Sequence, residues 1–270
     1  MASGTTAAAC VLIAALLLAA CGESKADPQP LEVEGGTYIA LGDSLSAGVG
    51  ASAPETTFVA LVRQHMGTDV ELMNLGHSGD TSSDLLEHGH LDEAVEAIEV
   101  RNSDADESND VRLVTLEIGG NDLLRIYFSL VQTGVCPNVE TTLENPECSA
   151  ALRDALDSFQ PNFESMVEAL RQAGPDVPLV LMTLYNPFSF LGRVGELGEL
   201  SLNGQAGSPF PEGLNDIILS VAAEHQGVTV ADQFAAFADK AAELISSDFI
   251  HPNDAGYRAM ADAIIAAMPE

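Results

Sequence analysis

Apolar runs recur along the chain from residue 37 onward, and they alternate with stretches in which apolar residues have helical spacing. The apolar runs lie at 37–41, 70–75, 111–118, 178–185 and 227–232. The helical patterns lie near 56–66, 80–100, 122–132, 150–173 and 213–226. Near-continuous apolar strands are typical of a parallel sheet that is covered on both faces. The alternation therefore predicts a three-layer α/β/α sandwich.

The end of the chain gives the clearest helical pattern. Its apolar residues form one stripe at helical spacing, which comprises Tyr257, Met260, Ala261, Ile264, Ile265 and Met268. A chain of 270 residues is long enough for one large α/β domain. We find no internal repeat, and we expect a single domain over residues 37–270.

The first 36 residues have a different character. Residues 7–20 are apolar and uncharged, too short to span a bilayer and typical of the core of a signal peptide. The sequence LAAC at 18–21 resembles the lipobox of bacterial lipoproteins, in which cleavage precedes an acylated cysteine. We therefore expect a signal peptide at 1–20, a lipidated Cys21, a flexible tether at 21–36 and an extracytoplasmic protein anchored to the membrane. Residues 1–6 lack the usual basic side chains, which leaves an uncleaved anchor as the alternative.

The remaining cysteines indicate a disulfide. Cys10 leaves with the signal peptide and Cys21 takes the lipid, so Cys136 and Cys148 remain. Outside the cytoplasm this pair should oxidise, and closing so short a loop is worth about 3 kcal/mol on the chain-entropy model. The alternative is two free, buried thiols.

The charge of the chain restricts its partners. The 41 acidic and 10 basic residues give a formal net charge of −31 at pH 7. Such a surface repels phosphate backbones, so we exclude nucleic acid as a partner. The acidic excess suits either a saline habitat or a very soluble surface, and it carries no information about the fold.

Four polar phrases follow predicted strands. They are GDSLSAG at 42–48, GHSGDTSSDL at 76–85, GGNDLL at 119–124 and DFIHPND at 248–254. In open parallel sheets, ligands bind outside the carboxyl ends of the strands, near the point where the strand order reverses. All four phrases fall at that edge, so we expect the functional site there.

The last phrase holds a candidate general base. Asp248 precedes His251 by three residues, so it can accept a hydrogen bond from one ring nitrogen and fix the tautomer of the imidazole. Pro252 favours an extended backbone at His251, before a helix that Asn253 or Asp254 caps. A histidine beside an ordinary helix cap is the alternative interpretation.

The other phrases hold a nucleophile and two hydrogen-bond donors. Ser44 follows a Gly-Asp turn at a strand end, and we expect it to open a helix whose dipole lies beneath its hydroxyl. Gly79 offers a backbone N–H that a substrate oxygen can approach, because no Cβ intervenes. Asn121 offers a neutral carboxamide N–H that suits a developing oxyanion. Each residue taken alone is more typical of a turn or a helix cap.

Together the motifs GDSL, the glycine of NLGHSGDT, GGND and DFIHP resemble the SGNH/GDSL hydrolase family, from about Tyr38 to the C-terminus. The resemblance implies a five-stranded parallel sheet in the order 2-1-3-4-5. It also implies Ser44 as nucleophile, an Asp248–His251 pair completing a triad, and an oxyanion hole made by Ser44, Gly79 and Asn121. We therefore expect a serine esterase or lipase that hydrolyses carboxylic esters. A carbohydrate or cell-wall O-deacetylase and a non-catalytic ligand-binding lipoprotein are the alternatives.

Two further features qualify this interpretation. His88 and His90 would need additional ligands that the sequence does not indicate, so we expect no metal. The expected ester chemistry needs no cofactor, and we expect a monomer. The long segment 186–213 mixes glycines with apolar side chains, which is typical of a flap that folds over an acyl chain. An ordered loop over the sheet end is the alternative.

Overall fold

The computed structural model describes Met1, residues 35–136 and residues 138–269, and within them five parallel strands form one sheet in the order β2-β1-β3-β4-β5. The strands are β1 (Thr37–Gly42), β2 (Glu71–Gly76), β3 (Val111–Glu117), β4 (Leu179–Met182) and β5 (Val228–Ala231). This order confirms the predicted arrangement. The expected signal peptide, Cys21 and the tether up to Glu34 lie outside the described residues.

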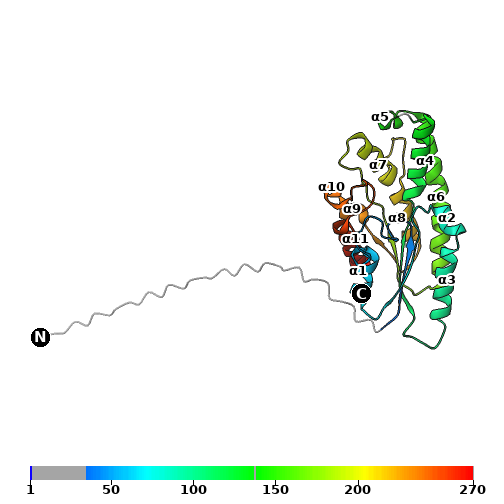
Figure 1. Cartoon of the computed structure of the whole chain (residues 1–270), viewed down its shortest axis with the longest axis vertical. Helices are drawn as coiled ribbons and strands as arrows, with labels where there is room; N and C mark the ends of the chain where they lie inside the picture. Colours follow the sequence, from blue (N-terminus) through cyan, green and yellow to red (C-terminus); the bar gives the residue numbers. More distant parts are fainter. Residues whose placement is uncertain (2–34, 137, 270) are drawn as a thin grey trace.

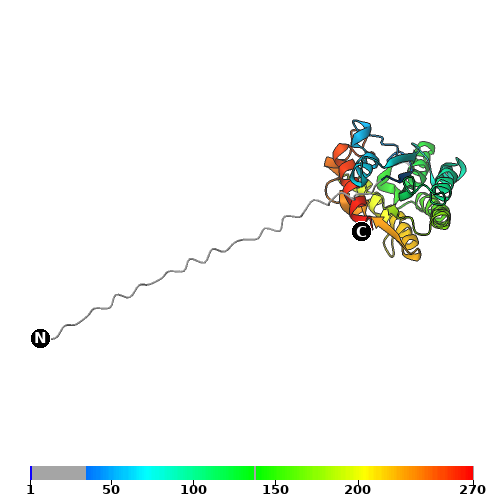
Figure 2. The same ribbon diagram turned by 90° about the horizontal axis from the view of Figure 1, so that it is seen from below.

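Helices cover both faces of the sheet (Figures 1 and 2). One layer comprises α1 (Phe58–Met66), α9 (Gln233–Phe237), α10 (Ala241–Leu244) and α11 (Asp254–Ala267). The opposite layer comprises α2 (Ser82–Glu87), α3 (His90–Arg101), α4 (Gly120–Thr133), α6 (Pro146–Ala173) and α8 (Leu214–Glu224). The remaining helices are α5 (Val139–Thr142), α7 (Arg193–Asn203) and the short 3₁₀ helix η1 (Pro54–Thr56).

Strand β1 explains why the sheet has a core on each side. Successive side chains of a strand point to opposite faces. Ile39 and Leu41 pack with the layer of α3 and α6, whereas Tyr38 and Ala40 pack with the layer of α1 and α11. All four side chains are fully buried, so the apolar run of β1 contributes to both cores.

Local sequence decides where the helices begin. Thr81 and Asp84 form a capping box at the start of α2. Asn253 caps α11 by accepting hydrogen bonds from two backbone N–H groups, so Asn253 is the cap and Asp254 is not. Asp254 instead accepts hydrogen bonds from the backbone and hydroxyl of Ser52 and from Thr56.

The segment at 186–213 contains the helix α7, and its role as a flap over an acyl chain stays a prediction. The structure corrects two other expectations. The helical pattern at 80–100 is two helices, because Gly89 adopts a left-handed conformation between α2 and α3. Ser44 lies in a run of turns over 44–50 and does not open a helix. Gly48 and Gly50 both have positive φ angles within this run, which the helical backbone excludes.

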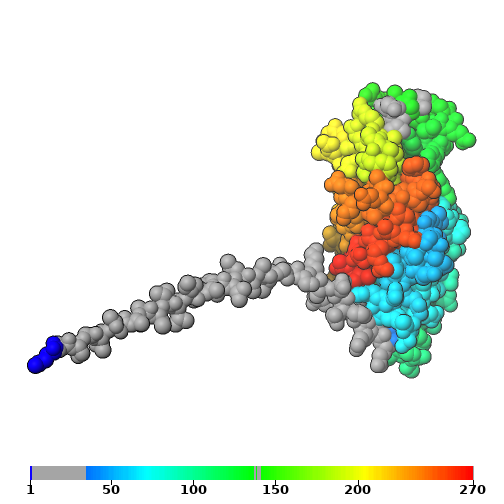
Figure 3. Space-filling view, turned by 60° about the vertical axis from the view of Figure 1, so that its left-hand side comes forward, coloured from blue at the N-terminus to red at the C-terminus, as the bar shows by residue number. Residues whose placement is uncertain are grey.

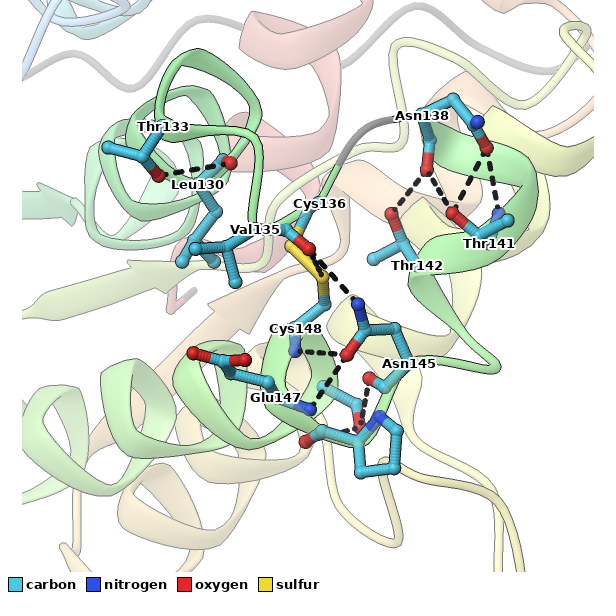
Figure 4. Close-up of a disulfide and its surroundings, with 12 residues drawn as sticks. Leu130, Thr133, Val135, Cys136, Asn138, Thr141, Thr142, Asn145, Glu147 and Cys148 are labelled. Carbon is cyan, nitrogen blue, oxygen red and sulfur yellow. Dashed lines mark hydrogen bonds between the residues drawn. A yellow bond between two sulfur atoms is a disulfide. The ribbon is translucent and has the colours of Figure 1, made fainter.

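A disulfide joins Cys136 to Cys148, as the sequence led us to expect (Figure 4). It connects the chain after α4 to the first turn of α6. Asn145 reinforces the connection, because its side chain caps α6 and also donates to the carbonyl of Val135 at 3.0 Å. The disulfide therefore fixes the end of the molecule where α5 contacts α7. Figure 3 shows this end, with the segment of α7 in yellow beside the α4–α6 connection in green.

Within the described residues, no helix is both long enough and apolar enough to cross a membrane.

Candidate active site

The site forms where the strand order reverses. β1 and β3 are neighbours, and Gly42 at the end of β1 pairs with Glu117 at the end of β3. The chain leaves β1 toward the layer of α1 and leaves β3 into α4 of the opposite layer. The turn that carries Ser44 and the start of α4 therefore lie on either side of one crevice.

The Ser44 turn depends on a close backbone approach. A Cβ added to Gly42 would lie 2.3 Å from the carbonyl oxygen of Glu117, so only glycine fits there. The N–H of Ala47 donates to the carbonyl of Asp43 at 3.0 Å and closes the turn. Ser44 itself is 8% exposed, which leaves its hydroxyl accessible from one side only.

A loop after α10 presents His251 to the serine. The Nε2 of His251 lies 2.9 Å from the Oγ of Ser44, and its Nδ1 lies 2.7 Å from the Oδ2 of Asp248. Phe249, which lies between Asp248 and His251 in the sequence, has a φ of 65°, and this backbone conformation is uncommon for residues other than glycine. The N–H of Ser246 donates to the carbonyl of His251 at 2.8 Å and closes the loop. The structure thus brings together the three residues predicted to act as a triad.

Hydrogen bonds keep the Asp248 carboxylate ionised. Partial burial alone would raise its pKa, but the backbone N–H groups of Ile250 and His251 and the hydroxyl of Ser246 donate to Oδ1 at 2.8–2.9 Å. With the His251 ring on Oδ2, these donors hold the pKa of Asp248 well below its usual range. An anionic Asp248 favours the tautomer with hydrogen on Nδ1, so Nε2 can accept the Ser44 proton.

The structure places the two predicted oxyanion donors differently relative to the cleft at Ser44. Asn121 is in the first turn of α4, and its Nδ2 donates to the Oδ2 of Asp43 and to the carbonyl of Asp80, both at 2.9 Å. An oxyanion would have to share one of these two hydrogens. Gly79 has φ of 93°, and an added Cβ would meet only Arg125 within 4 Å. Gly79 lies outside the lining of the cleft at Ser44, whereas Asn121 is part of it.

Two buried carboxyl groups lie beneath Ser44, and neither was predicted from the sequence. Asp43 is 3% exposed and Glu117 is 1% exposed. Burial raises the pKa of Asp43 to about 6, and burial followed by the charge of Asp43 raises the pKa of Glu117 well above its usual range. Burial and the neighbouring carboxyl group of Asp43 thus both favour the neutral form of Glu117. A glutamate at the end of an apolar strand was the signal that could have revealed this pair.

The Asp43 carboxylate positions the groups around the nucleophile. The Oδ1 of Asp43 accepts a hydrogen bond from the N–H of Leu45 at 3.1 Å, and its Oδ2 accepts the one from Asn121. The hydroxyl of Ser44 also lies 3.3 Å from Oδ1. One buried carboxylate thus fixes both the Ser44 turn and the carboxamide across the crevice.

A cleft of about 190 Å³ opens above Ser44, and His251 and Asn121 contribute to its lining. An apolar cavity of about 120 Å³ adjoins the cleft. The two share the lining residues Gly120, Leu124, Leu184, Tyr185 and Pro187. Helix α7 closes the apolar cavity with Val194, Leu197, Gly198, Ser201 and Leu202. The polar cleft at Ser44 therefore continues into the apolar cavity.

The fold also changes the interpretation of the two histidines that flank Gly89. The sequence indicated no further ligands for His88 and His90, but the structure brings His77 and Asp80 to them. These two ligands were not predicted from the sequence. They lie 8 to 13 residues before the two histidines, in the loop after β2, and the fold brings them into reach.

Comparison with known proteins agrees with this geometry. The profile of the GDSL-like lipase/acylhydrolase family matches residues 40–259. The spore germination lipase LipC of Bacillus licheniformis is 28% identical over 241 residues, which are 85% of this chain and 95% of that lipase. The lipase Lip_vut3 from a goat rumen metagenome has a similar fold, with a TM-score of 0.61 and 22% identity over 86% of this chain and 96% of that one. Phospholipase A1 from Streptomyces albidoflavus NA297 has a TM-score of 0.59 and 23% identity, and the match covers 87% of this chain and 100% of that one. Because the family profile spans most of its length, the chain belongs to the GDSL-like lipase/acylhydrolase family of hydrolases.

Proposed function

We propose that this protein is an extracytoplasmic, lipid-anchored serine esterase that hydrolyses esters of apolar acyl chains. The observation that carries the proposal is the continuous contact from Asp248 through His251 to Ser44, with distances of 2.7 and 2.9 Å. These are hydrogen-bond distances for a nucleophile, a base and the group that orients the base.

The reaction follows from these positions. Nε2 of His251 takes the hydroxyl proton while Oγ of Ser44 attacks the ester carbonyl. The oxyanion that forms accepts hydrogen bonds from the N–H groups of Ser44 and Gly79 and from the carboxamide of Asn121. His251 then protonates the departing alcohol and leaves an acyl-enzyme. Water attacks the acyl-enzyme with His251 again as base, which releases the acid and restores the Ser44 hydroxyl.

The apolar cavity beside the cleft favours an acyl chain as the substrate group. An acyl group on Ser44 would lie in the cleft, and its chain would continue past Leu124 and Leu184 into the cavity under α7. Each buried methylene contributes about 0.8 kcal/mol. The relatives named a lipase and a phospholipase A1 support the same substrate class. The chain has no tryptophan, so it has few platforms for stacking sugars.

The proposed location rests on the N-terminal sequence. The lipobox-like LAAC at 18–21 would place a lipid on Cys21, and residues up to 36 would tether the domain. Mass spectrometry of the mature protein tests this point. We expect an acylated N-terminal Cys21 and release of the protein from membranes by Cys21→Ser. An unmodified Cys21 would contradict the anchor and leave the esterase proposal standing.

A covalent probe and an ester panel test the chemistry. A fluorophosphonate should label the wild-type protein at Ser44 and should not label Ser44→Ala. On p-nitrophenyl esters of two to twelve carbons, kcat/KM should peak at medium chain length. Absence of labelling would contradict the esterase and favour a ligand-binding lipoprotein. Activity confined to acetyl esters, acetylated sugars included, would favour the O-deacetylase.

A pocket-filling variant locates the acyl chain. Val194 lines the apolar cavity and is half-buried, so Val194→Trp should fill part of it without disturbing Ser44. We expect the loss of kcat/KM on eight-carbon esters to exceed the loss on acetate esters by about tenfold, which corresponds to two buried methylenes. Leu219→Trp is the matched control, because Leu219 is exposed on α8 and outside the cavity. Equal losses on both esters would place the acyl chain elsewhere.

A further inference from the structure

Three histidines and one aspartate gather beside the active site, and the proposed ester chemistry uses none of their side chains. His77 and Asp80 lie in the loop after β2, His88 ends α2, and His90 begins α3. One ligand atom from each residue lies within 4.8 Å of the other three. Gly89, with φ of 84°, turns the chain between the last two histidines. All four residues lie within 77–90, and the fold of this stretch brings their side chains together.

The buried carboxylate is the centre of the cluster. The side chain of Asp80 is 3% exposed, whereas those of His77 and His88 are 58% and 46% exposed. Its Oδ1 lies 2.7 Å from Nδ1 of His77, and its Oδ2 lies 3.3 Å from Nδ1 of His88. Across the described ranges, the ion-pair partners of Asp80 are these two rings and no lysine or arginine.

A divalent cation suits the surroundings of this carboxylate. A buried carboxylate needs a cationic partner, and within the described residues no lysine or arginine forms an ion pair with Asp80. The ring centroids of His77, His88 and His90 lie 5.6–6.3 Å apart, so the three rings can surround one ion beside Asp80. A single divalent cation would balance Asp80 and accept the lone pairs of neutral rings.

We propose that His77, Asp80, His88 and His90 bind one divalent transition-metal ion of the zinc class. Three imidazole nitrogens and one carboxylate oxygen are the number and kind of ligands that a tetrahedral zinc ion takes. With bonds of about 2.1 Å, tetrahedral ligand atoms lie about 3.4 Å apart, so the ligand atoms must close by about 1.4 Å at most. The exposed rings of His77 and His88 can rotate to achieve this. Ca²⁺ and Mg²⁺ prefer oxygen ligands and should bind weakly.

The ion would hold the loop that carries Gly79. The carbonyl of Asp80 accepts a hydrogen bond from Asn121 at 2.9 Å, and Arg125 donates to the carbonyl of Gly79. Arg125 also pairs with Asp84 of α2 at 2.8 Å. A metal bound to Asp80 therefore restrains two of the three donors that we assign to the oxyanion, Gly79 and Asn121. Because these donors act on charge that develops during the reaction, the ion should affect kcat more than KM.

Metal titration of the untagged protein tests the site. After treatment with a chelator and its removal, the chain should take up one Zn²⁺ that His88→Gln and His90→Gln abolish or weaken more than tenfold. At a hundredfold excess over Kd, Zn²⁺ should raise Tm by about 5–10 °C, and Ca²⁺ should not. His65→Gln removes a histidine of α1 outside the cluster and should bind Zn²⁺ like the wild type. Absence of stoichiometric uptake, or uptake unchanged in the two cluster variants, would overturn the proposal.

A kinetic measurement tests the link to the loop separately. With an ester substrate, removal of the metal should lower kcat with little change in KM, by less than the 10²–10³-fold that loss of one oxyanion donor costs. The loss should disappear on stoichiometric Zn²⁺ return to wild type and should persist in His90→Gln. Equal kcat with and without metal would overturn the link. The outcome of the zinc titration does not depend on the esterase proposal, so failure of either one can be recognised.

Discussion

The molecule contains two Asp–His pairs with the same local geometry and different surroundings. In each, the residues are three apart in sequence and a carboxylate oxygen lies 2.7 Å from Nδ1 of the ring. His251 has Asp248 before it, and His77 has Asp80 after it. The His77–Asp80 pair lies in the loop after β2, whereas the Asp248–His251 pair lies in the loop between α10 and α11.

The burial of the two pairs is reversed. The His251 ring is 18% exposed and Asp248 is 44% exposed, whereas the His77 ring is 58% exposed and Asp80 is 3% exposed. The His251 ring therefore points its free nitrogen at Ser44, inside a cleft. The His77 ring faces two other histidines at the surface. An Asp–His pair becomes a base or a ligand according to what the second ring nitrogen meets, and the pair alone does not decide this.

Removing each ring should produce very unequal losses. His251→Ala should lower kcat by about 10⁴–10⁶-fold, because Ser44 loses the base that takes its proton. His77→Ala should lower kcat by less than about tenfold, because its ring acts only through the loop that carries Gly79. Steady-state kinetics with a p-nitrophenyl ester measure both effects.

A double variant provides the control for this comparison. Ser44→Ala combined with His251→Ala should be barely slower than either single variant, because the members of a triad act as a unit. Losses that multiply would contradict the assignment of His251 as the base of Ser44. A loss of kcat in His77→Ala as large as that in His251→Ala would mean that the contact of the second ring nitrogen does not distinguish the roles of the two pairs.

Asn121 connects the regions of the two pairs, and its removal should have the next largest effect. Its carboxamide donates to Asp43 beneath Ser44 and to the carbonyl of Asp80. Asn121→Ala should lower kcat by about 10²–10³-fold with little change in KM, because the amide stabilises the oxyanion. Asn162→Ala is the control, since this α6 amide donates to Ser82 and Ser83 away from the cleft. Full turnover in Asn121→Ala would show that the amide only ties the loops together.

The buried Glu117 beneath Ser44 should make the free energy of unfolding depend on pH. Its pKa is raised in the folded state by burial and then by the charge of Asp43. Folding therefore takes up a proton above the usual glutamate pKa, and the free energy of unfolding falls by about 1.4 kcal/mol for each pH unit from about 4.5 up to the folded pKa. Glu117→Gln should remove this slope.

Urea denaturation at pH 5 to 8 measures the slope. Relative to wild type, Glu117→Gln should become progressively more stable as the pH rises. Glu224→Gln, at an exposed position of α8, is the matched control and should keep the wild-type slope. Parallel curves for Glu117→Gln and wild type would mean that Glu117 is not the proton carrier beneath Ser44.

The apolar pattern predicted the fold because its information is local. A run such as 111–118 can be buried on both faces only as a central parallel strand, and parallel strands bring their carboxyl ends to one edge. The strand pattern was therefore enough to place Ser44 and Asn121 together at that edge, whereas His251 reaches it on the loop after α10. The Ser44 turn was predicted wrongly as a helix start, because the positive φ of Gly48 is not evident from the sequence.

The histidine cluster could not have been predicted in the same way. Gly89 turns the chain between α2 and α3, which leaves ligand atoms of both His88 and His90 within 4.8 Å of one of Asp80, and Asp122 of α4 holds the start of α2 through Ser82. These contacts depend on how the loop after β2 and the two helices are arranged in space, which the strand pattern does not encode. The strand pattern placed the loop at the correct edge, and tertiary packing then decided which side chains meet there.

The smallest expected effect concerns the response of Asp248 to acid. Hydrogen bonds lower the pKa of Asp248 in the folded state despite partial burial. A lowered pKa stabilises the fold above the unfolded value of about 3.9, and this contribution is lost as the pH falls toward the folded value. The difference in unfolding free energy between wild type and Asp248→Asn should therefore be largest near pH 6 and should shrink below about pH 4.

Because 44% of the side chain is exposed, solvent screens the interaction and the difference should be small. Urea denaturation between pH 3 and 7 measures it, with exposed Asp176→Asn as the control. A difference that stays constant down to pH 3 would mean that the His251 loop does not hold Asp248 as an anion, and it would remove the physical reason for the His251 tautomer that the esterase requires.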